Sequence, residues 1–196
     1  MNKFKFNFRK NWFLLAIFLL GLVYVLVPGP ESIYEVPAVP YSLKSIQEGD
    51  TFQNKNIAAY YTNYRRAFLT FFYKSYFEKQ LIPGLPIPLI TLNHPPELAG
   101  VYVRDQQEST FLEEYTRPLR ESLFVNGYEP LVENFIRRRQ ADKLGNNIIY
   151  NGELYATKTT VRYYPTLAIF RVLVYLGIWA AGIYLYRLFR SVQKKY

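Results

Sequence analysis

Two apolar segments at opposite ends of the chain place the strongest constraint on its fold. Trp12–Val27 is a run of 16 residues without a charged side chain, and Leu167–Phe189 is a run of 23 residues whose only charges are Arg171 and Arg187. As α-helices they would span roughly 24 and 35 Å, compared with about 30 Å for the hydrocarbon core of a bilayer. Two such runs in one short chain favour membrane helices over buried core helices. The pattern predicts a transmembrane helix over the first run and another over residues 166–189.

The excess of positive charge lies at the two ends of the chain. Residues 1–11 and 190–196 are basic tails without an acidic residue, whereas residues 28–165 hold 15 basic and 15 acidic side chains. Because cytoplasmic segments are enriched in lysine and arginine, both tails are expected in the cytoplasm and residues 28–165 outside it. The net charge of +9 and the pI of about 9.6 then reflect membrane topology, and no nucleic-acid partner is expected.

The first apolar segment also has the basic start and apolar centre of an export signal. The sequence that follows it, PGPESIYEVPAVP, has no small-x-small cleavage site close behind the apolar run. We therefore expect an uncleaved signal-anchor and a two-pass protein of the cell membrane. Cleavage would instead leave a single-pass protein with the same exported domain.

The composition excludes several classes of site. There is no cysteine, which excludes disulfides, thiol nucleophiles, cysteine-ligated zinc and iron–sulfur clusters, and the single histidine, His94, is the only imidazole base. The sequence has no glycine-rich phosphate loop, EF-hand loop, His-Glu-x-x-His or Gly-x-Ser-x-Gly motif. We expect no cofactor, no metal site and no catalytic residue.

The exported part is predicted to be a single α+β domain, mostly helical, over residues 57–165, after a proline-rich linker over residues 28–56. The strongest helix pattern runs from Asn56, as its N-cap, to Gln80, and it is rich in aromatic side chains. We interpret it as a core helix, with contact to the membrane interface as the alternative. The apolar stretch over residues 81–92 has too many prolines for a helix or a central strand.

A C-terminal β-hairpin is predicted around Asn151-Gly152, a dipeptide typical of type I′ turns. Its second arm leads through Pro165 into the second apolar segment. The hairpin is therefore expected close to the membrane, with Tyr163 and Tyr164 at the headgroup boundary.

The segment between residues 92 and 122 is polar, and its spacing favours helical surfaces. His94 with the two prolines after it predicts a helix start, and Thr110 with Glu113 fits a capping box. Arg117 and Glu121 are four residues apart, as in a helical ion pair. Pro118, between them, predicts a kink followed by a second short helix that stops at Asn126-Gly127.

A hydrolytic site is the competing interpretation of this segment. It would use two carboxylates as acid and base, with Glu113 and Glu114 as the first candidates. Adjacent residues project about 100° apart on a helix, so these two would not converge on one bond. The sequence also shows neither an orienting partner nor a nucleophile for His94.

Two groups of residues are candidates for contacts with other molecules or helices: clustered arginines for anion binding and small residues for helix packing. Guanidinium groups bind carboxylates and phosphates, so the arginines would hold an anionic lipid headgroup, a cell-wall polymer or acidic residues of a partner, unless acids of the same domain neutralise them. The second apolar segment carries small residues that permit close helix packing. The candidates are Arg117, Arg120, Arg137, Arg138 and Arg139 for the anion and Gly177, Ala181 and Gly182 for packing.

These features predict a non-enzymatic membrane protein that presents an extracytoplasmic interaction domain. Its expected partners are the lipid bilayer and another membrane or envelope protein, within a complex of which it is a subunit, scaffold or assembly factor. The first alternative is a ligand-binding or sensory module that signals through a partner. The second is a membrane-anchored hydrolase of envelope glycan or lipid.

Overall fold

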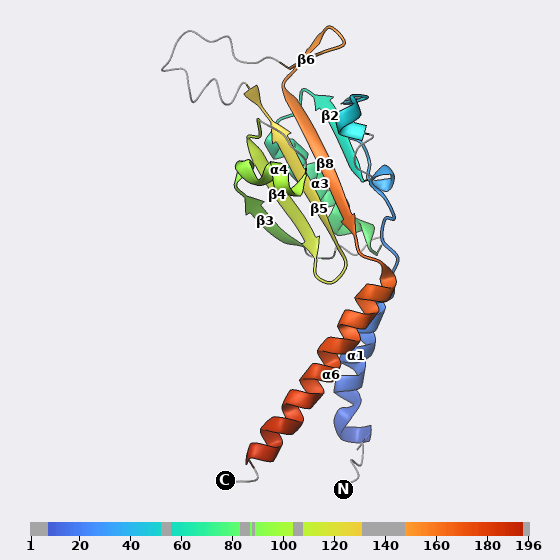
Figure 1. Ribbon diagram of the computed structural model, residues 1–196. Coiled ribbons are helices and arrows are strands. Elements are labelled where there is room, and N and C mark those ends of the chain that lie inside the picture. The colour runs from blue at the N-terminus through green and yellow to red at the C-terminus, as the bar shows by residue number, and fades with distance from the viewer. Residues whose placement is uncertain are drawn as a thin grey trace. The chain divides into compact units, whose positions relative to one another are not determined.

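The computed structural model describes residues 8–51, 56–82, 87, 89–103, 108–130 and 148–193. The chain divides into two compact units: Met1–Pro28 together with Thr166–Tyr196, and Gly29–Pro165. We call the first the helical unit and the second the domain (Figure 1).

The helical unit contains two apolar helices, α1 (Phe8–Leu26) and α6 (Ala168–Gln193). With 26 residues, α6 is long and apolar enough to cross a membrane, whereas the apolar part of α1, Trp12–Leu26, is shorter. The prediction of an apolar helix near each end is confirmed, and α6 meets the length and composition of a membrane span.

The two helices contact each other through aromatic side chains. Tyr175 of α6 donates a hydrogen bond from its hydroxyl to the backbone carbonyl of Phe18 at 2.7 Å, and the Phe18 and Trp179 rings meet edge to face with centroids 5.4 Å apart. Gly21 of α1 lies against the Tyr175 ring, where an added Cβ would collide. The small residue that permits this contact is therefore on α1.

The small residues predicted for packing lie elsewhere on α6. No atom of the described residues comes within 4 Å of an added Cβ at Gly177 or Gly182, and Ala181 is exposed. Their packing against another helix stays a prediction.

The domain is built on a six-stranded antiparallel sheet, with the strand order β1-β2-β8-β5-β4-β3. Its strands are β1 (Leu43–Lys44), β2 (Ile57–Thr62), β3 (Ile90–His94), β4 (Phe111–Arg117), β5 (Glu121–Tyr128) and β8 (Thr157–Pro165). A separate hairpin consists of β6 (Ile148–Tyr150) and β7 (Glu153–Tyr155). The helical elements are η1 (Ile33–Glu35), α2 (Glu48–Thr51), α3 (Arg66–Gln80), η2 (Pro96–Leu98) and α4 (Ala99–Tyr102). The α+β prediction is confirmed, but the prediction of a mostly helical domain is wrong.

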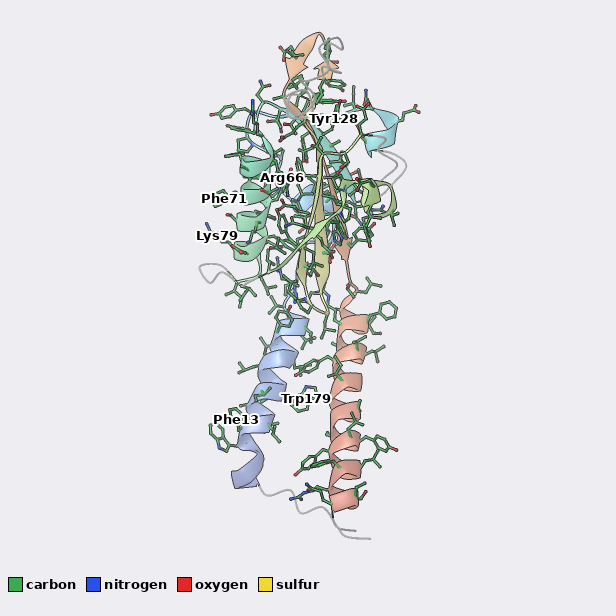
Figure 2. The ribbon with its side chains drawn as sticks, turned by 90° about the vertical axis from the view of Figure 1, so that its left-hand side faces the viewer. Phe13, Arg66, Phe71, Lys79, Tyr128 and Trp179 are labelled. Atoms are coloured by element: carbon green, nitrogen blue, oxygen red, sulfur yellow. The ribbon has the colours of Figure 1, made fainter. Side chains whose placement is uncertain are left out.

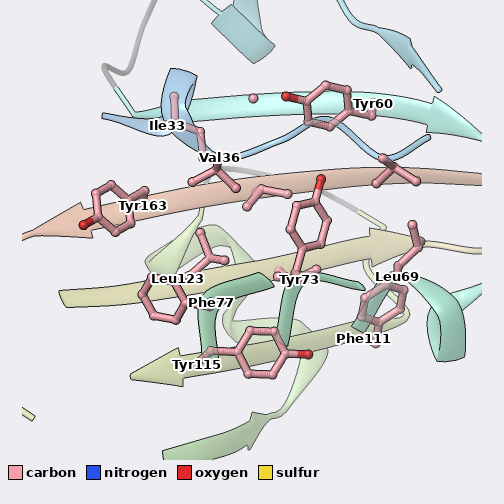
Figure 3. Close-up of a cluster of buried hydrophobic side chains, with 14 residues drawn as sticks. Ile33, Val36, Tyr60, Leu69, Tyr73, Phe77, Phe111, Tyr115, Leu123 and Tyr163 are labelled. Atoms are coloured by element: carbon pink, nitrogen blue, oxygen red, sulfur yellow. The ribbon is translucent and has the colours of Figure 1, made fainter. Parts of the chain in front are cut away.

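The main core lies between α3 and the sheet (Figure 3). α3 buries Leu69, Tyr73 and Phe77, which share one face of the helix at four-residue spacing. They pack against residues that alternate along β4, β5 and β8, namely Phe111, Tyr115, Leu123, Val125, Val161 and Tyr163. Burying a side chain of this size stabilises the fold by about 1.5–3 kcal/mol. Residues 28–56, predicted to be a linker, also contribute to this core through Ile33, Val36 and Val39.

The opposite face of the sheet carries a smaller cluster under α4, which includes Ala99, Val103, Leu112 and Phe124. α3 and α4 thus cover opposite faces of the sheet (Figure 1), and we call these the α3 face and the α4 face.

Buried tyrosines make the domain sensitive to alkali. Burial, and then the nearby Tyr60 hydroxyl, raise the pKa of Tyr73 well above its usual value of 10.0. Burial, and then Glu113, raise the pKa of Tyr115. In the unfolded chain these phenols ionise near pH 10, whereas in the folded domain they keep their protons, so unfolding is favoured as the pH rises above 10. We expect the free energy of unfolding to be unaffected by these tyrosines below pH 9 and to fall from pH 10 upward as they ionise in the unfolded chain.

Thermal unfolding of the full chain between pH 8 and pH 11.5 measures this effect. Tyr73→Phe should lose less stability between pH 8 and pH 11 than the unchanged protein. An equal loss in both would show that ionisation of Tyr73 does not contribute.

The long helix predicted from Asn56 to Gln80 is wrong in its first part. Residues 57–62 form β2, Asn56 has a φ of 73° and does not cap a helix, and α3 begins at Arg66. All six side chains of β2 are buried, so the strand shows no polar–apolar alternation. Such a short, continuously apolar run cannot be distinguished from a helix by its period.

Strands also replace the helices predicted around Pro118. Thr110 and Glu113 form no capping box, since β4 begins at Phe111, and the predicted stop at Asn126-Gly127 lies inside β5. Pro118 occupies the turn between the two strands, which the Arg120 amide closes by donating to the Arg117 carbonyl at 3.0 Å. Leu119 takes a φ of 67°, as the third residue of a type II turn does. The chain therefore reverses here, where a kink was predicted.

The hairpin prediction at Asn151-Gly152 is confirmed. These residues have φ values of 51° and 82° and join β6 to β7, as a type I′ turn requires. The hairpin precedes β8 and therefore lies at the end of that strand opposite Pro165. Tyr163 is also not at a headgroup boundary, because it is buried in the core and donates its hydroxyl hydrogen to the Pro30 carbonyl at 2.9 Å.

Candidate functional site

Two of the predicted arginines meet one carboxylate at the turn between β4 and β5. Arg117 Nη1 and Arg120 Nε each lie 3.1 Å from Glu121 Oε1, and all three side chains are fully buried. Arg117 and Glu121 face each other across the hairpin as the last ladder pair of the two strands. Their four-residue spacing, predicted to be helical, is instead the spacing of a tight turn. We call these three residues the turn cluster.

The turn cluster attaches the end of α3 to the sheet. Arg117 Nη2 donates to the Phe77 carbonyl at 2.6 Å and to Gln80 Oε1 at 2.9 Å, and its guanidinium lies 4.0 Å from the centre of the Phe77 ring. A cation at this place is favourable because the last carbonyls of a helix carry partial negative charge. Phe77 thus receives both a hydrogen bond and a cation–π contact from one side chain.

Both ends of the domain adjoin the turn cluster. A Cβ on Gly29 would lie 3.0 Å from Glu121 Oε2 and 3.2 Å from Arg120 Nη2, and Glu121 is the ladder partner of Pro165. The chain therefore enters and leaves the domain at the same buried carboxylate. We call this the exit end of the sheet.

The guanidinium groups of Arg117 and Arg120 point into the domain, where Glu121 and the end of α3 surround them. Contact of these two residues with an external anion stays a prediction that requires the hairpin to open. Arg137, Arg138 and Arg139, the other predicted anion contacts, lie outside the described residues.

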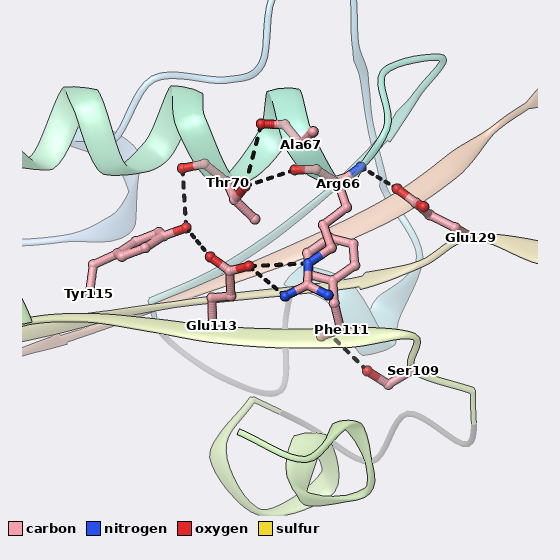
Figure 4. Close-up of polar contacts among 8 residues, drawn as sticks. All are labelled: Arg66, Ala67, Thr70, Ser109, Phe111, Glu113, Tyr115 and Glu129. Atoms are coloured by element: carbon pink, nitrogen blue, oxygen red, sulfur yellow. Dashed lines mark hydrogen bonds and ion pairs between the residues drawn. The ribbon is translucent and has the colours of Figure 1, made fainter. Parts of the chain in front are cut away.

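Glu113, predicted to cap a helix, belongs to a network on the α3 face (Figure 4). Arg66 donates from Nε and Nη2 to Glu113 Oε1 at 3.1 and 2.8 Å, and Tyr115 donates its hydroxyl hydrogen to Glu113 Oε2 at 2.7 Å. The Arg66 amide donates to Glu129, which supplies a carboxylate at the start of α3. The first turn of α3 is thus capped by Glu129, the residue after β5, and not by its own N-cap residue, while Glu113 of β4 binds the side chain of Arg66.

His94 and Glu114 form a second polar group, on the α4 face. His94 Nε2 lies 2.9 Å from Glu114 Oε2, and Ser122 donates its hydroxyl hydrogen to Glu114 Oε1 at 2.8 Å. The His94 and Glu114 side chains are 18% and 14% exposed. His94 ends strand β3, whereas the sequence predicted a helix start at this residue; η2 does begin two residues later, at Pro96.

Aromatic rings fill the space beside this group. Tyr102 lies against the His94 ring with centroids 5.0 Å apart and stacks on Phe124 at 5.2 Å. Tyr164 meets Phe124 edge to face and donates its hydroxyl hydrogen to the Tyr102 carbonyl at 2.6 Å. Arg162 binds the C-terminal end of α4 by donating a hydrogen bond to the carbonyl of Val103, the residue after that helix, at 2.9 Å. These contacts attach α4 to the sheet.

The geometry does not bring the predicted carboxylates together. Glu113 and Glu114 are neighbours in β4, so their side chains point to opposite faces of the sheet. In the group on the α4 face the carboxylate lies between Ser122 and His94, whereas a serine–histidine–carboxylate triad requires the imidazole in the middle. Within the described part of the chain, no three His, Cys, Asp or Glu side chains are grouped as metal ligands.

The outer edge of the sheet, at β3, was not predicted from the sequence. β3 pairs with β4 along one side, from Ile90 opposite Thr116 to His94 opposite Leu112. Its apolar side chains remain accessible, with Ile90 47% and Leu92 42% exposed. The alternation of Ile90, Thr91, Leu92 and Asn93 signals a strand, but the surrounding prolines led to the expectation of an irregular connector.

α3 also carries exposed apolar surface, on the side turned away from the sheet. Phe71, which is 69% exposed, and Lys79 both point outward from the helix (Figure 2). α3 is a core helix through its buried side, as predicted, whereas contact of its outer side with the membrane interface stays a prediction.

Comparisons with protein-family models, with curated proteins and with solved structures found no match to this chain.

Proposed function

We propose that this chain is a non-enzymatic, two-pass membrane protein whose domain is an extracytoplasmic interaction module. In this proposal α1 and α6 anchor the domain, and both chain ends lie in the cytoplasm. The protein acts as a subunit, scaffold or assembly factor of a complex in the cell envelope.

Charge and length support the membrane part of the proposal. α6 has the length and apolar composition of a membrane span, and a basic tail without acidic residues adjoins each apolar helix. Such tails are retained in the cytoplasm. The domain between the helices has equal numbers of acidic and basic residues and is connected to both helices at one end of its sheet.

The accessible edge of β3 is the observation that supports an interaction role for the domain. The notable polar groups of the domain bind one another: the turn cluster is buried, Glu113 holds Arg66 and Tyr115, and Glu114 holds Ser122 and His94. By contrast, Ile90 and Leu92 present apolar side chains on a sheet edge. A surface with accessible apolar groups and internally paired polar groups favours protein binding over chemistry on a small substrate.

Crosslinking of intact cells tests topology and interaction together. A membrane-impermeant amine crosslinker reaches lysines of the domain, among them Lys44 and the partly exposed Lys158, but not the lysines of cytoplasmic tails. We expect a large fraction of the chain to be joined to a second, different protein. A chain that stays unmodified in intact cells, or that is extracted in mild detergent as a monomer after crosslinking, would contradict the proposal.

A further inference from the structure

The two edges of the sheet differ in how they are protected. β1, at one edge, has two residues, one of which is Lys44. β3, at the other edge, has five residues, and all but His94 are exposed. A very short strand and a lysine are common protections against unwanted strand pairing, and β3 has neither.

No strand among the described residues pairs with the outer side of β3. Alternate backbone amides and carbonyls of an edge strand point away from the sheet, where they can bind a further strand. Ile90, Thr91, Leu92 and Asn93 carry no charge that would repel such a strand. The edge is therefore free to extend the sheet in the part of the chain that is described.

We propose that β3 binds an extended segment of a partner protein, which adds to the sheet as a seventh strand. This inference rests on the proposed function and specifies the surface and the mode of binding. Main-chain hydrogen bonds would supply affinity, and the side chains of β3 would select the sequence of the added strand.

The direction of β3 favours a different protein over a second copy of this chain. Ile90 is paired with Thr116 near the exit end and His94 with Leu112 far from it, so β3 runs away from the exit end. Two-fold-symmetric pairing of β3 with its copy would be antiparallel and would place the two exit ends at opposite ends of the joined sheet. Two copies anchored in one membrane have their exit ends on the same side of it.

The exposed side chains define the chemistry of the partner segment. On the α4 face, Ile90 and Leu92 offer apolar contacts, while on the α3 face Thr91 and Asn93 offer neutral hydrogen-bonding groups. The matching segment is uncharged and free of proline, with apolar residues at every second position. Five residues bury little area, so the complex depends on the high effective concentration that two proteins in one membrane have for each other.

Photo-crosslinking from single positions in intact cells tests the strand addition. Benzoylphenylalanine is placed in turn at Thr91 and at Asn93, and the same group at Phe71, on the outer side of α3, is the control. We expect both β3 positions to attach to one segment of one protein. Because the strands would pair residue by residue, moving the probe by two residues should move the attachment point by two residues.

A charge at the edge supplies the second readout. Leu92→Lys should reduce the amount of adduct formed from Asn93 by about tenfold, whereas the matched control Phe71→Lys should leave it unchanged. Both replaced residues are accessible, at 42% and 69% exposure, and thermal melting confirms that each variant is folded. If Leu92→Lys melts early, Ile90→Lys at 47% exposure takes its place.

The outcomes separate the two proposals. Attachment to scattered segments, to lipid, to this chain itself or to a second copy of it overturns strand addition. A partner captured from Phe71 but not from β3 overturns strand addition and leaves the interaction module standing. No protein adduct from any position contradicts both.

Discussion

Replacing Glu121 with glutamine should lower the free energy of unfolding of the domain by about 3–5 kcal/mol, the cost that follows when a buried charge loses its partner. Glu121 Oε1 is 3.1 Å from both Arg117 Nη1 and Arg120 Nε, with all three side chains inaccessible to water. Glutamine keeps the shape of the side chain but removes its charge. Two guanidinium groups would then remain close together and buried without the carboxylate that lies between them.

Thermal or denaturant unfolding of the full chain measures this loss. The matched control is Glu153→Gln, because Glu153 is an exposed residue of the β6–β7 hairpin and its replacement should change stability by less than about 0.5 kcal/mol. A second variant, Glu121→Gln with Arg120→Met, removes one of the two charges and should recover part of the stability. A loss below 1 kcal/mol for Glu121→Gln would show that the turn cluster does not stabilise the domain.

Replacing Gly127 with alanine should lower the free energy of unfolding by about 1–3 kcal/mol, the range found for overpacked cores. Gly127 is the ladder partner of Phe111, and the Phe111 ring lies across the position that a Cβ would occupy. The ring belongs to the main core and also lies 5.4 Å from the Arg66 guanidinium, so it cannot move aside without disturbing α3.

The same unfolding measurement checks this prediction. Gly182→Ala is the control, since no described atom lies within 4 Å of the new Cβ. Combining Gly127→Ala with Phe111→Leu should restore part of the lost stability, because the smaller side chain leaves room for the methyl group. Equal stability of Gly127→Ala and the unchanged protein would mean that the ring does not fill this space.

The ends of the chain and the Asn151-Gly152 hairpin were predictable because each depends on local sequence. An apolar run specifies its helix by length, and Asn-Gly specifies its turn by the positive φ values that both residues accept. The α+β class follows from the same signals. None of them requires knowledge of which distant segments meet.

The secondary structure in the middle of the domain was not predictable, because its residue spacings are compatible with both helices and strands. Arg117 and Glu121 are four residues apart both along a helix and across a three-residue hairpin connection, and only the pairing of their strands with β3 and β8 decides between the two. Asn126-Gly127 signals a turn, but in β5 the glycine makes room for Phe111. Local preference was overruled in both places by contacts with residues far away in sequence.

The polar groups depend on such contacts as well. His94 meets Glu114 across 20 positions of sequence, and Arg66 meets Glu113 across 47. Both pairs exist because strand pairing places β3 and β4 side by side and α3 above them. The sequence pattern assigned Glu113 to a capping box with Thr110 and showed no partner for His94, and it gave no sign that Arg66 would pair with Glu113.

Gly29 and Pro165 both lie beside Glu121, so the two ends of the domain are close together, as in a domain inserted into a loop. A module whose first and last residues adjoin can be placed within a short connection between two helices without changing the distance which that connection has to cover. For the same reason it can be removed as one piece and replaced by a few residues. The helical unit and the domain are thus separable parts of the chain, and each could be exchanged by design without altering the other.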